Sequence, residues 1–315
     1  MTYKLTLERI RGHGTTARNA KDHGRSAMRV MPLSRGAFLA RAAFVVSLLP
    51  TLVAFRFGTP DPTVTEWPLP EFAEPSSIVY HPERKSIFIV GDEGDIGEVS
   101  LEGKLLRSSH LGGDLEGITI DPATGLLYVA REGHEIVFEV QPDDFKITRR
   151  YTIDRTFEGN PNFLARGGDG IEGITFVPDS QAKEGGRFYA ANQYDPAVLI
   201  ELAIPIRSSK EKFENARILS SHPVETAPLS DVIWEPRHEA FLVVSALWKK
   251  VYVVDAEGRN LRSARIPGLM PEGLAMLPDG RFLISQDTGG LLVWAPPADP
   301  FAAEAAAEPS AKPAP

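Results

Sequence analysis

Short runs of alternating apolar and polar residues recur along the middle of the chain, and each run ends at a proline. Five segments share this shape: Ser76–Pro82, Glu116–Pro122, Glu172–Pro178, Ser230–Pro236 and Glu272–Pro278. Each is followed by a short turn and a second apolar run, and the starts lie 40, 56, 58 and 42 residues apart. Short strands separated by turn residues at this period are typical of the blades of a β-propeller.

The last repeat contains three strand-like runs, the last of them ending near Trp294, and lacks a fourth. One unassigned strand-like segment, Thr63–Trp67, precedes the first repeat. If this segment completes the last blade, the ring has no open strand edge. We therefore predict an all-β fold over residues 63–297: a five-bladed β-propeller of four-stranded blades, closed by an N-terminal strand. A sixth blade within the long third interval is disfavoured, because the extra residues, 179–186 and 208–215, have the composition of loops.

The N-terminal part of the chain has the pattern of a targeting segment. Residues 1–36 are basic and polar, and we expect them to be disordered. Residues 37–57 contain an apolar run, Ala42–Phe55, whose length suits the core of a signal peptide and is short for a membrane-spanning helix. Pro50 interrupts the run and no small-residue cleavage motif follows it, so a signal peptide and an uncleaved membrane anchor both remain open, with a buried amphipathic helix as the other alternative. Either targeting segment predicts export to the periplasm or to the extracytoplasmic face of the inner membrane.

Composition and charge exclude some kinds of binding site and argue against some functions. The 315 residues include no cysteine, which excludes disulfides, thiolate metal sites and a cysteine-linked lipid anchor. The net charge is −8 although the N-terminal segment is basic, so the rest of the chain is strongly acidic. An acidic body repels phosphate backbones and argues against nucleic-acid binding, whereas it is compatible with cation binding. Residues 298–315 are rich in alanine and proline, and we predict a disordered tail.

Three repeats begin with a Glu-Gly pair. The first strand of each propeller blade lines the central channel, so Glu116, Glu172 and Glu272 should converge on one axis. Their mutual repulsion there would require protons or a cation, and Ca²⁺, which takes several oxygen ligands, suits such a ring. Asp231 of the fourth repeat could add a further oxygen ligand. The structural alternative is that each glutamate caps a turn and each glycine supplies the backbone conformation that the turn needs.

Polar residues also follow the second strand of each repeat and form a second candidate ring, which either extends a ligand pocket or consists of solvated turns. These residues are Asp92-Glu93, Arg131-Glu132, Asn192-Gln193, Ser245 and Gln286-Asp287. The chain contains no G-x-S-x-G elbow, no H-E-x-x-H motif and no P-loop. Gly168–Gly173 matches G-x-G-x-x-G but leads into a predicted strand rather than a helix, so we do not interpret it as a dinucleotide site.

The stretches Asp114–Val129, Gly170–Ile174 and Pro271–Ala275 resemble the SdiA-regulated family of bacterial β-propellers, which is distantly similar to NHL-repeat proteins. The resemblance covers residues from about Val64 to Trp294. It implies a five-bladed propeller, an N-terminal membrane or export segment and bound calcium, with Glu116, Glu172 and Glu272 carried over by motif. Ser76 and Ser230 stand where the other repeats have glutamate, which departs from a fully carboxylate ring.

Two function classes follow from these observations. The first is a calcium-binding propeller of the cell envelope that binds a small ligand or an envelope protein. The alternative is a calcium-dependent hydrolase of phosphoesters, lactones or other esters, similar to phytase-like or esterase-like propellers. The absence of a recognisable base–nucleophile pair favours the first class. We expect a monomer that contacts the membrane only through its N-terminal segment, if that segment is uncleaved.

Overall fold

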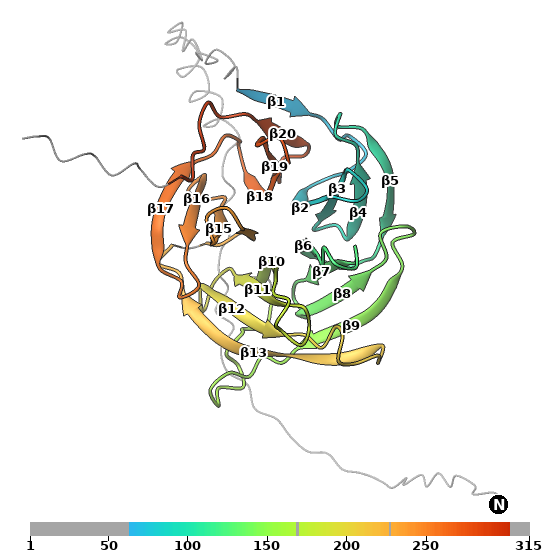
Figure 1. Cartoon of the computed structure of the whole chain (residues 1–315), viewed down its shortest axis with the longest axis vertical. Coiled ribbons are helices and arrows are strands. Elements are labelled where there is room, and N and C mark those ends of the chain that lie inside the picture. Colours follow the sequence, from blue (N-terminus) through green and yellow to red (C-terminus); the bar gives the residue numbers. More distant parts are fainter. Residues whose placement is uncertain (1–62, 168–169, 227, 303–315) are drawn as a thin grey trace, which may run out of the picture. The chain divides into compact units, whose positions relative to one another are not determined.

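The computed structural model describes residues 63–167, 170–226 and 228–302, which belong to the compact unit Gly58–Pro315 (Figure 1). These residues form twenty β-strands and no α-helix. No helix in this part of the chain is long and apolar enough to cross a membrane. The predicted segments 1–36 and 37–57 lie outside the described residues, as do residues 303–315 of the predicted tail.

Each sequence repeat folds into an antiparallel sheet unit whose first strand contains the predicted segment. Two of the units are separate sheets of consecutive strands: β2 (Pro75–His81), β3 (Ser86–Gly91), β4 (Asp95–Val99) and β5 (Leu105–His110); and β14 (Asp231–Glu235), β15 (Ala240–Ser245), β16 (Lys250–Val254) and β17 (Asn260–Arg265). Two others join into one eight-stranded sheet: β6 (Leu115–Ile120), β7 (Leu127–Arg131), β8 (Ile136–Val140) and β9 (Ile147–Ile153); and β10 (Ile171–Pro178), β11 (Gly186–Asn192), β12 (Val198–Ala203) and β13 (Phe213–Pro223). The last unit has the strand order β1 (Val64–Trp67), β20 (Leu291–Trp294), β19 (Phe282–Gln286) and β18 (Pro271–Met276).

The pairing of the N-terminal strand with the last repeat is confirmed. Strand β1 runs antiparallel to β20, with Val64 opposite Trp294 and Trp67 opposite Leu291. The units surround a central opening, with β2, β6, β10 and β18 innermost and β5, β9, β13 and β17 at the periphery (Figure 1). Contacts run from β2 to β6, β10, β14 and β18 and then back to β2, so the inner strands form a closed ring. The described residues therefore form a β-propeller.

One lateral connection differs from the sequence-based expectation. Residues 208–215 were expected to be loop, but Phe213, Glu214 and Asn215 begin strand β13 and pair in parallel with Arg150–Thr152 of β9. This parallel pairing fuses two neighbouring units at their outer edges and satisfies backbone groups that would otherwise face solvent.

The first five residues of the predicted tail, 298–302, lie within the described structure and contact the last two units. Phe301 has no exposed surface and packs edge-on against Phe282 and near Trp294, within the apolar cluster between the last two units. Asp299 accepts a hydrogen bond from the Phe301 backbone amide at 2.9 Å and lies 3.0 Å from Nε2 of His238. The buried ring of Phe301 and the contact of Asp299 with His238 therefore hold this segment against the sheets.

The core lies between neighbouring sheets rather than within one of them. Tyr189 of β11 and Phe241 of β15, for example, have ring centroids 4.6 Å apart across the interface between two units. Side-chain hydroxyls of the inner strands add hydrogen bonds across these interfaces. Thr119 Oγ1 accepts the amide N–H of Phe176 at 3.0 Å, and Thr175 Oγ1 accepts that of Trp234 at 2.9 Å.

The Thr175 hydrogen bond provides a test of this interface. Thr175→Val retains the shape of a buried side chain but leaves the Trp234 amide without its acceptor, which costs about 1–3 kcal/mol of unfolding free energy. Thr175→Ser keeps the hydroxyl and should lose distinctly less. Urea or thermal unfolding of the two variants and the wild type measures this difference, and equal stabilities for Val and Ser would show that the hydrogen bond contributes nothing.

Candidate functional site

A β-bulge at the start of the inner strands directs the predicted glutamates toward the central opening. In β6 the register passes from Leu115 opposite Arg131 to Gly117 opposite Ala130, which leaves Glu116 unpaired. In β10 it passes from Ile171 to Gly173 and leaves Glu172 unpaired. An unpaired bulge residue bends the strand and re-aims its side chain.

The bulge recurs in the first and last units. Strand β2 skips Ser76, and β18 is irregular between Pro271 and Leu274, the interval that contains Glu272. The Glu-Gly repeat of the sequence therefore marks an irregularity of the ladder that is repeated around the ring.

The glycine of each Glu-Gly pair is required by close packing and not by turn geometry. A Cβ atom at Gly117 would lie 2.8 Å from the Ile174 nitrogen, and one at Gly173 would lie 2.6 Å from the Val232 nitrogen. At Gly273 a Cβ would lie 2.5 Å from the carbonyl oxygen of Ser76. Each obstacle is backbone of the neighbouring inner strand, and none of the three glycines has a positive φ. The alternative in which glycine supplies a special turn conformation is therefore wrong.

The three glutamates line one cavity of about 140 Å³. The lining residues are Glu74, Ser76, Asp92, Glu116, Glu172, Gln193, Glu272 and Asp287. The structure thus brings together the three glutamates of the first candidate ring with Asp92, Gln193 and Asp287 of the second. Every lining side chain offers at least one oxygen atom, and Oδ1 of Asp92 is buried without a hydrogen-bond partner.

Burial and mutual repulsion raise the pKa values of these carboxyl groups. Burial, followed by the negative charges of Glu116 and Glu132, raises the pKa of Glu172 to about 11. Burial, followed by the hydrogen bond and charge of Asp114, raises the pKa of Glu116 to about 9. The pKa of Glu272 rises to about 7, again through burial first and then through the charge of Asp287. Without a cation, this group of carboxyls retains protons at neutral pH.

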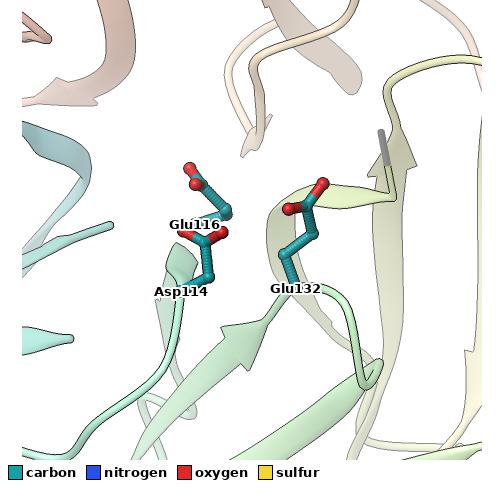
Figure 2. Close-up of side chains that lie close together, drawn as sticks. All are labelled: Asp114, Glu116 and Glu132. Atoms are coloured by element: carbon teal, nitrogen blue, oxygen red, sulfur yellow. The ribbon is translucent and has the colours of Figure 1, made fainter. Parts of the chain in front are cut away.

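A second acidic group shares Glu116 with this cavity. Oxygen atoms of Asp114, Glu116 and Glu132 lie within 4.8 Å of one another, and Figure 2 shows the three carboxylates facing a common space. Glu132 is buried, and its Oε1 accepts the amide N–H of Gly170 at 2.7 Å. Sequence reasoning placed Glu132 only in the second candidate ring and did not select Asp114. The signal for Asp114 was its position two residues before Glu116, which puts both side chains on the same side of an extended strand.

Asp231 has a different role from the predicted metal ligand. It is fully buried and is not among the residues that line the cavity. Its Oδ1 accepts the Val232 amide at 2.8 Å, and its Oδ2 accepts the Leu274 amide of the next inner strand at 3.1 Å. Asp231 stands at the position of the glycine in the Glu-Gly repeats, and its carboxylate joins neighbouring units as the threonine hydroxyls do elsewhere. We therefore leave Asp231 out of the cavity's candidate ligands.

Among the remaining members of the second candidate ring, Asn192 and Gln286 hold local structure, whereas Nε of Arg131 and Oγ of Ser245 are buried without a hydrogen-bond partner. The side-chain nitrogen of Asn192 donates to the carbonyl oxygens of Tyr194 and Pro196 at 2.7 and 2.8 Å. Gln286 Oε1 accepts the amide of Leu269 at 2.9 Å. Ser245 is fully buried, and Arg131 lies over Gly113.

Residues 63–290 match the family described as SdiA-regulated. The chain belongs to the SdiA-regulated family. No curated protein matches it. Among solved structures, glutaminyl cyclase of Myxococcus xanthus is similar with a TM-score of 0.52 and 14% identity, over 73% of this chain and 93% of that one. A protein of unknown function from Bacteroides caccae gives a TM-score of 0.47 and 15% identity, over 70% of this chain and 73% of that one. At these identities the glutaminyl cyclase likeness shows the propeller fold alone.

The raised pKa values predict how the stability of the metal-free protein depends on pH. Glutamates in the unfolded chain ionise near pH 4.5, whereas in the fold Glu272 and Glu116 do so near pH 7 and 9. The fold therefore holds more protons, and its stability falls as pH rises from about 5 to 9. In the presence of chelator, Glu172→Gln should flatten this decline, because it removes a carboxyl that holds its proton in the fold and loses it in the unfolded chain.

Thermal melts across this pH range measure the effect, with Glu102→Gln, an exposed turn position, as the matched control. Burial lowers the pKa of His81, and the contribution of this residue is the same in the wild type and both variants. A Glu172→Gln variant with the same slope as the wild type would contradict the electrostatic assignment.

Proposed function

We propose that this protein is a five-bladed, calcium-binding β-propeller of the cell envelope that binds a small ligand or a partner protein at its acidic face. The proposed blade number is supported by the succession of four-stranded units and by the closed circle of inner-strand contacts. The main observation that supports a metal site is the acidic cavity, where six carboxyl groups, one hydroxyl and one amide converge from the ends of several strands.

The side chains of the acidic cavity are of the kind that bind calcium, and among the described residues the carboxyl oxygens that lie within 4.8 Å of one another are those of Asp114, Glu116 and Glu132. Ca²⁺ takes six to eight oxygen ligands from carboxylates, amides and water, and the lining contains only oxygen-bearing side chains. Glu116, Glu172 and Glu272 would provide the central ligands, with Asp92 and Asp287 at the same cavity. The unpartnered Oδ1 of Asp92 is a buried acceptor that a cation would satisfy. When bound, the ion would neutralise carboxylates that otherwise hold protons.

Calcium should therefore stabilise the folded protein. A ligand that binds only the folded state at a hundredfold above its Kd adds about 2.7 kcal/mol to the free energy of unfolding. Purified wild-type protein should melt higher with calcium than with chelator, and by more at pH 8 than at pH 5, because binding displaces protons from Glu116 and Glu172. Glu172→Gln should lose most of this response, whereas Glu102→Gln should keep it.

Metal analysis and calorimetric titration with Ca²⁺ and with Mg²⁺ complete this test. The proposal fails if the wild type contains no metal as purified and if calcium changes neither its melting temperature nor the heat of titration. A response to Mg²⁺ equal to that for Ca²⁺ would retain a cation site but contradict its assignment to calcium.

The hydrolase alternative has one observation in its favour. The pKa of Glu272 is raised to about 7, near the value at which a carboxylate serves as a general base at neutral pH. Among the described lining residues of this cavity there is no histidine, and Ser76 is the single hydroxyl. A panel of phosphoester, lactone and carboxyl ester substrates, each assayed with calcium and with chelator, separates the two functions. If a substrate is turned over, and if this turnover is lost with chelator and in Glu272→Gln, hydrolysis rather than ligand binding is the function of the cavity.

Export is part of the proposed function and rests on the basic flank and the apolar run Ala42–Phe55. Residues 1–60 fused to a reporter that is active only outside the cytoplasm should give activity, and Val46→Arg within the apolar run should reduce it strongly. Fractionation then shows whether the fusion is released as a cleaved protein or remains with the membrane. A fusion without extracytoplasmic activity would contradict export.

A further inference from the structure

A second cavity, of about 350 Å³, is built from the same inner strands at the ends opposite to the acidic cavity. Glu116, the second residue of β6, lines the acidic cavity, whereas Ile118 and Ile120 of the same strand line the second one. Four residues of extended chain span about 13 Å. The inner strands therefore present carboxylates at one end of the ring and apolar side chains at the other.

The lining of this second cavity, here called the apolar cavity, contains no charged residue. It includes Tyr80, Ile120, Phe176, Trp234 and Met276, which come from five different inner strands. All of these except Phe176 are half-buried, so their side chains face the space rather than filling it.

Two of the polar side chains around the apolar cavity are already used within the fold. The hydroxyl oxygens of Thr119 and Thr175 accept backbone amides of the neighbouring inner strands. The exposed prolines that end the repeats line the rim: Pro82, Pro122, Pro178 and Pro236. Proline has no amide N–H to donate, and it fixes the chain direction where each inner strand ends. At these four rim positions the backbone therefore offers no N–H donor, and the side chains of Tyr80 and Trp234 add donors to the lining.

We propose that the apolar cavity is a binding site for a small neutral molecule with an aromatic or aliphatic framework. Its volume lies within the range of small-molecule pockets and is too small for a folded protein segment. A charged ligand would lose its hydration without gaining a partner, because no lining residue carries a charge. The site is separate from the acidic cavity and does not depend on a bound cation.

Trp234 makes this site measurable in the full-length protein. The neutral dye N-phenyl-1-naphthylamine, which accepts energy from indole, should bind with saturable fluorescence at micromolar concentrations. Trp234→Phe should keep dye binding but lower the energy transfer, because Trp234 is the one tryptophan of the chain that lines the cavity in the described structure. Ile120→Asn, at a half-buried position in the mouth, should weaken binding by about tenfold or more.

Matched controls separate this site from surface adsorption and from the cation site. Leu106→Asn replaces an exposed leucine on the peripheral strand β5 and should bind the dye as the wild type does. Chelator and Glu172→Gln should also leave dye affinity unchanged, so failure of the calcium proposal would not affect this result. Melting temperatures confirm that each variant is folded.

Several outcomes would overturn the proposal. They include the absence of saturable dye binding to the wild type, equal affinity for the wild type and Ile120→Asn, and energy transfer in Trp234→Phe that equals that of the wild type. Tighter binding of the anionic dye 1-anilinonaphthalene-8-sulfonate than of the neutral dye would likewise contradict an uncharged site.

Discussion

The approach of neighbouring inner strands at the centre of the ring is the constraint on which the rest of the structure depends. At Gly117, Gly173 and Gly273 the backbone of the next strand lies where a Cβ atom would stand. Only glycine fits there without movement of the neighbouring backbone. The bulge beside these glycines leaves the preceding residue outside the ladder, and this is why the glutamates point into the opening. The packing that closes the ring thus also creates the acidic cavity.

Local pattern was sufficient to predict the repeat and its closure. The repeat was recognised from a proline at a constant offset, and the closure from one unassigned strand-like segment, Thr63–Trp67. Both signals lie within short segments of sequence, and the strand pairing confirms both predictions. The convergence of Glu116, Glu172 and Glu272 was also predictable, because equivalent positions of a ring must face the same axis. In each of these cases, positions that recur along the sequence occupy equivalent positions around the ring.

Features that depend on contacts between units were not readable in this way. Asp231 resembles a cation ligand in sequence, but two backbone amides occupy its carboxylate, one of them from the next strand. The parallel pairing of β9 with β13 depends on how far a long strand reaches across a neighbour. Phe301 lies in a low-complexity segment and is buried only because the last two sheets leave space for one ring. Asp114 becomes a candidate metal ligand only through its proximity to Glu132, which comes from the end of another strand.

The pairing of β1 with β20 has a consequence for the order in which the protein folds. The outer strand of the last sheet is made first, yet its partner is among the last strands to be synthesised. Contacts between such distant segments form late, because the entropy of closing a long loop must be overcome before the contact contributes. During synthesis the chain therefore carries an unpaired N-terminal strand and an open ring until residues near Trp294 have emerged. A chain that stops short of that point retains two free strand edges, which are surfaces for misassembly with another chain.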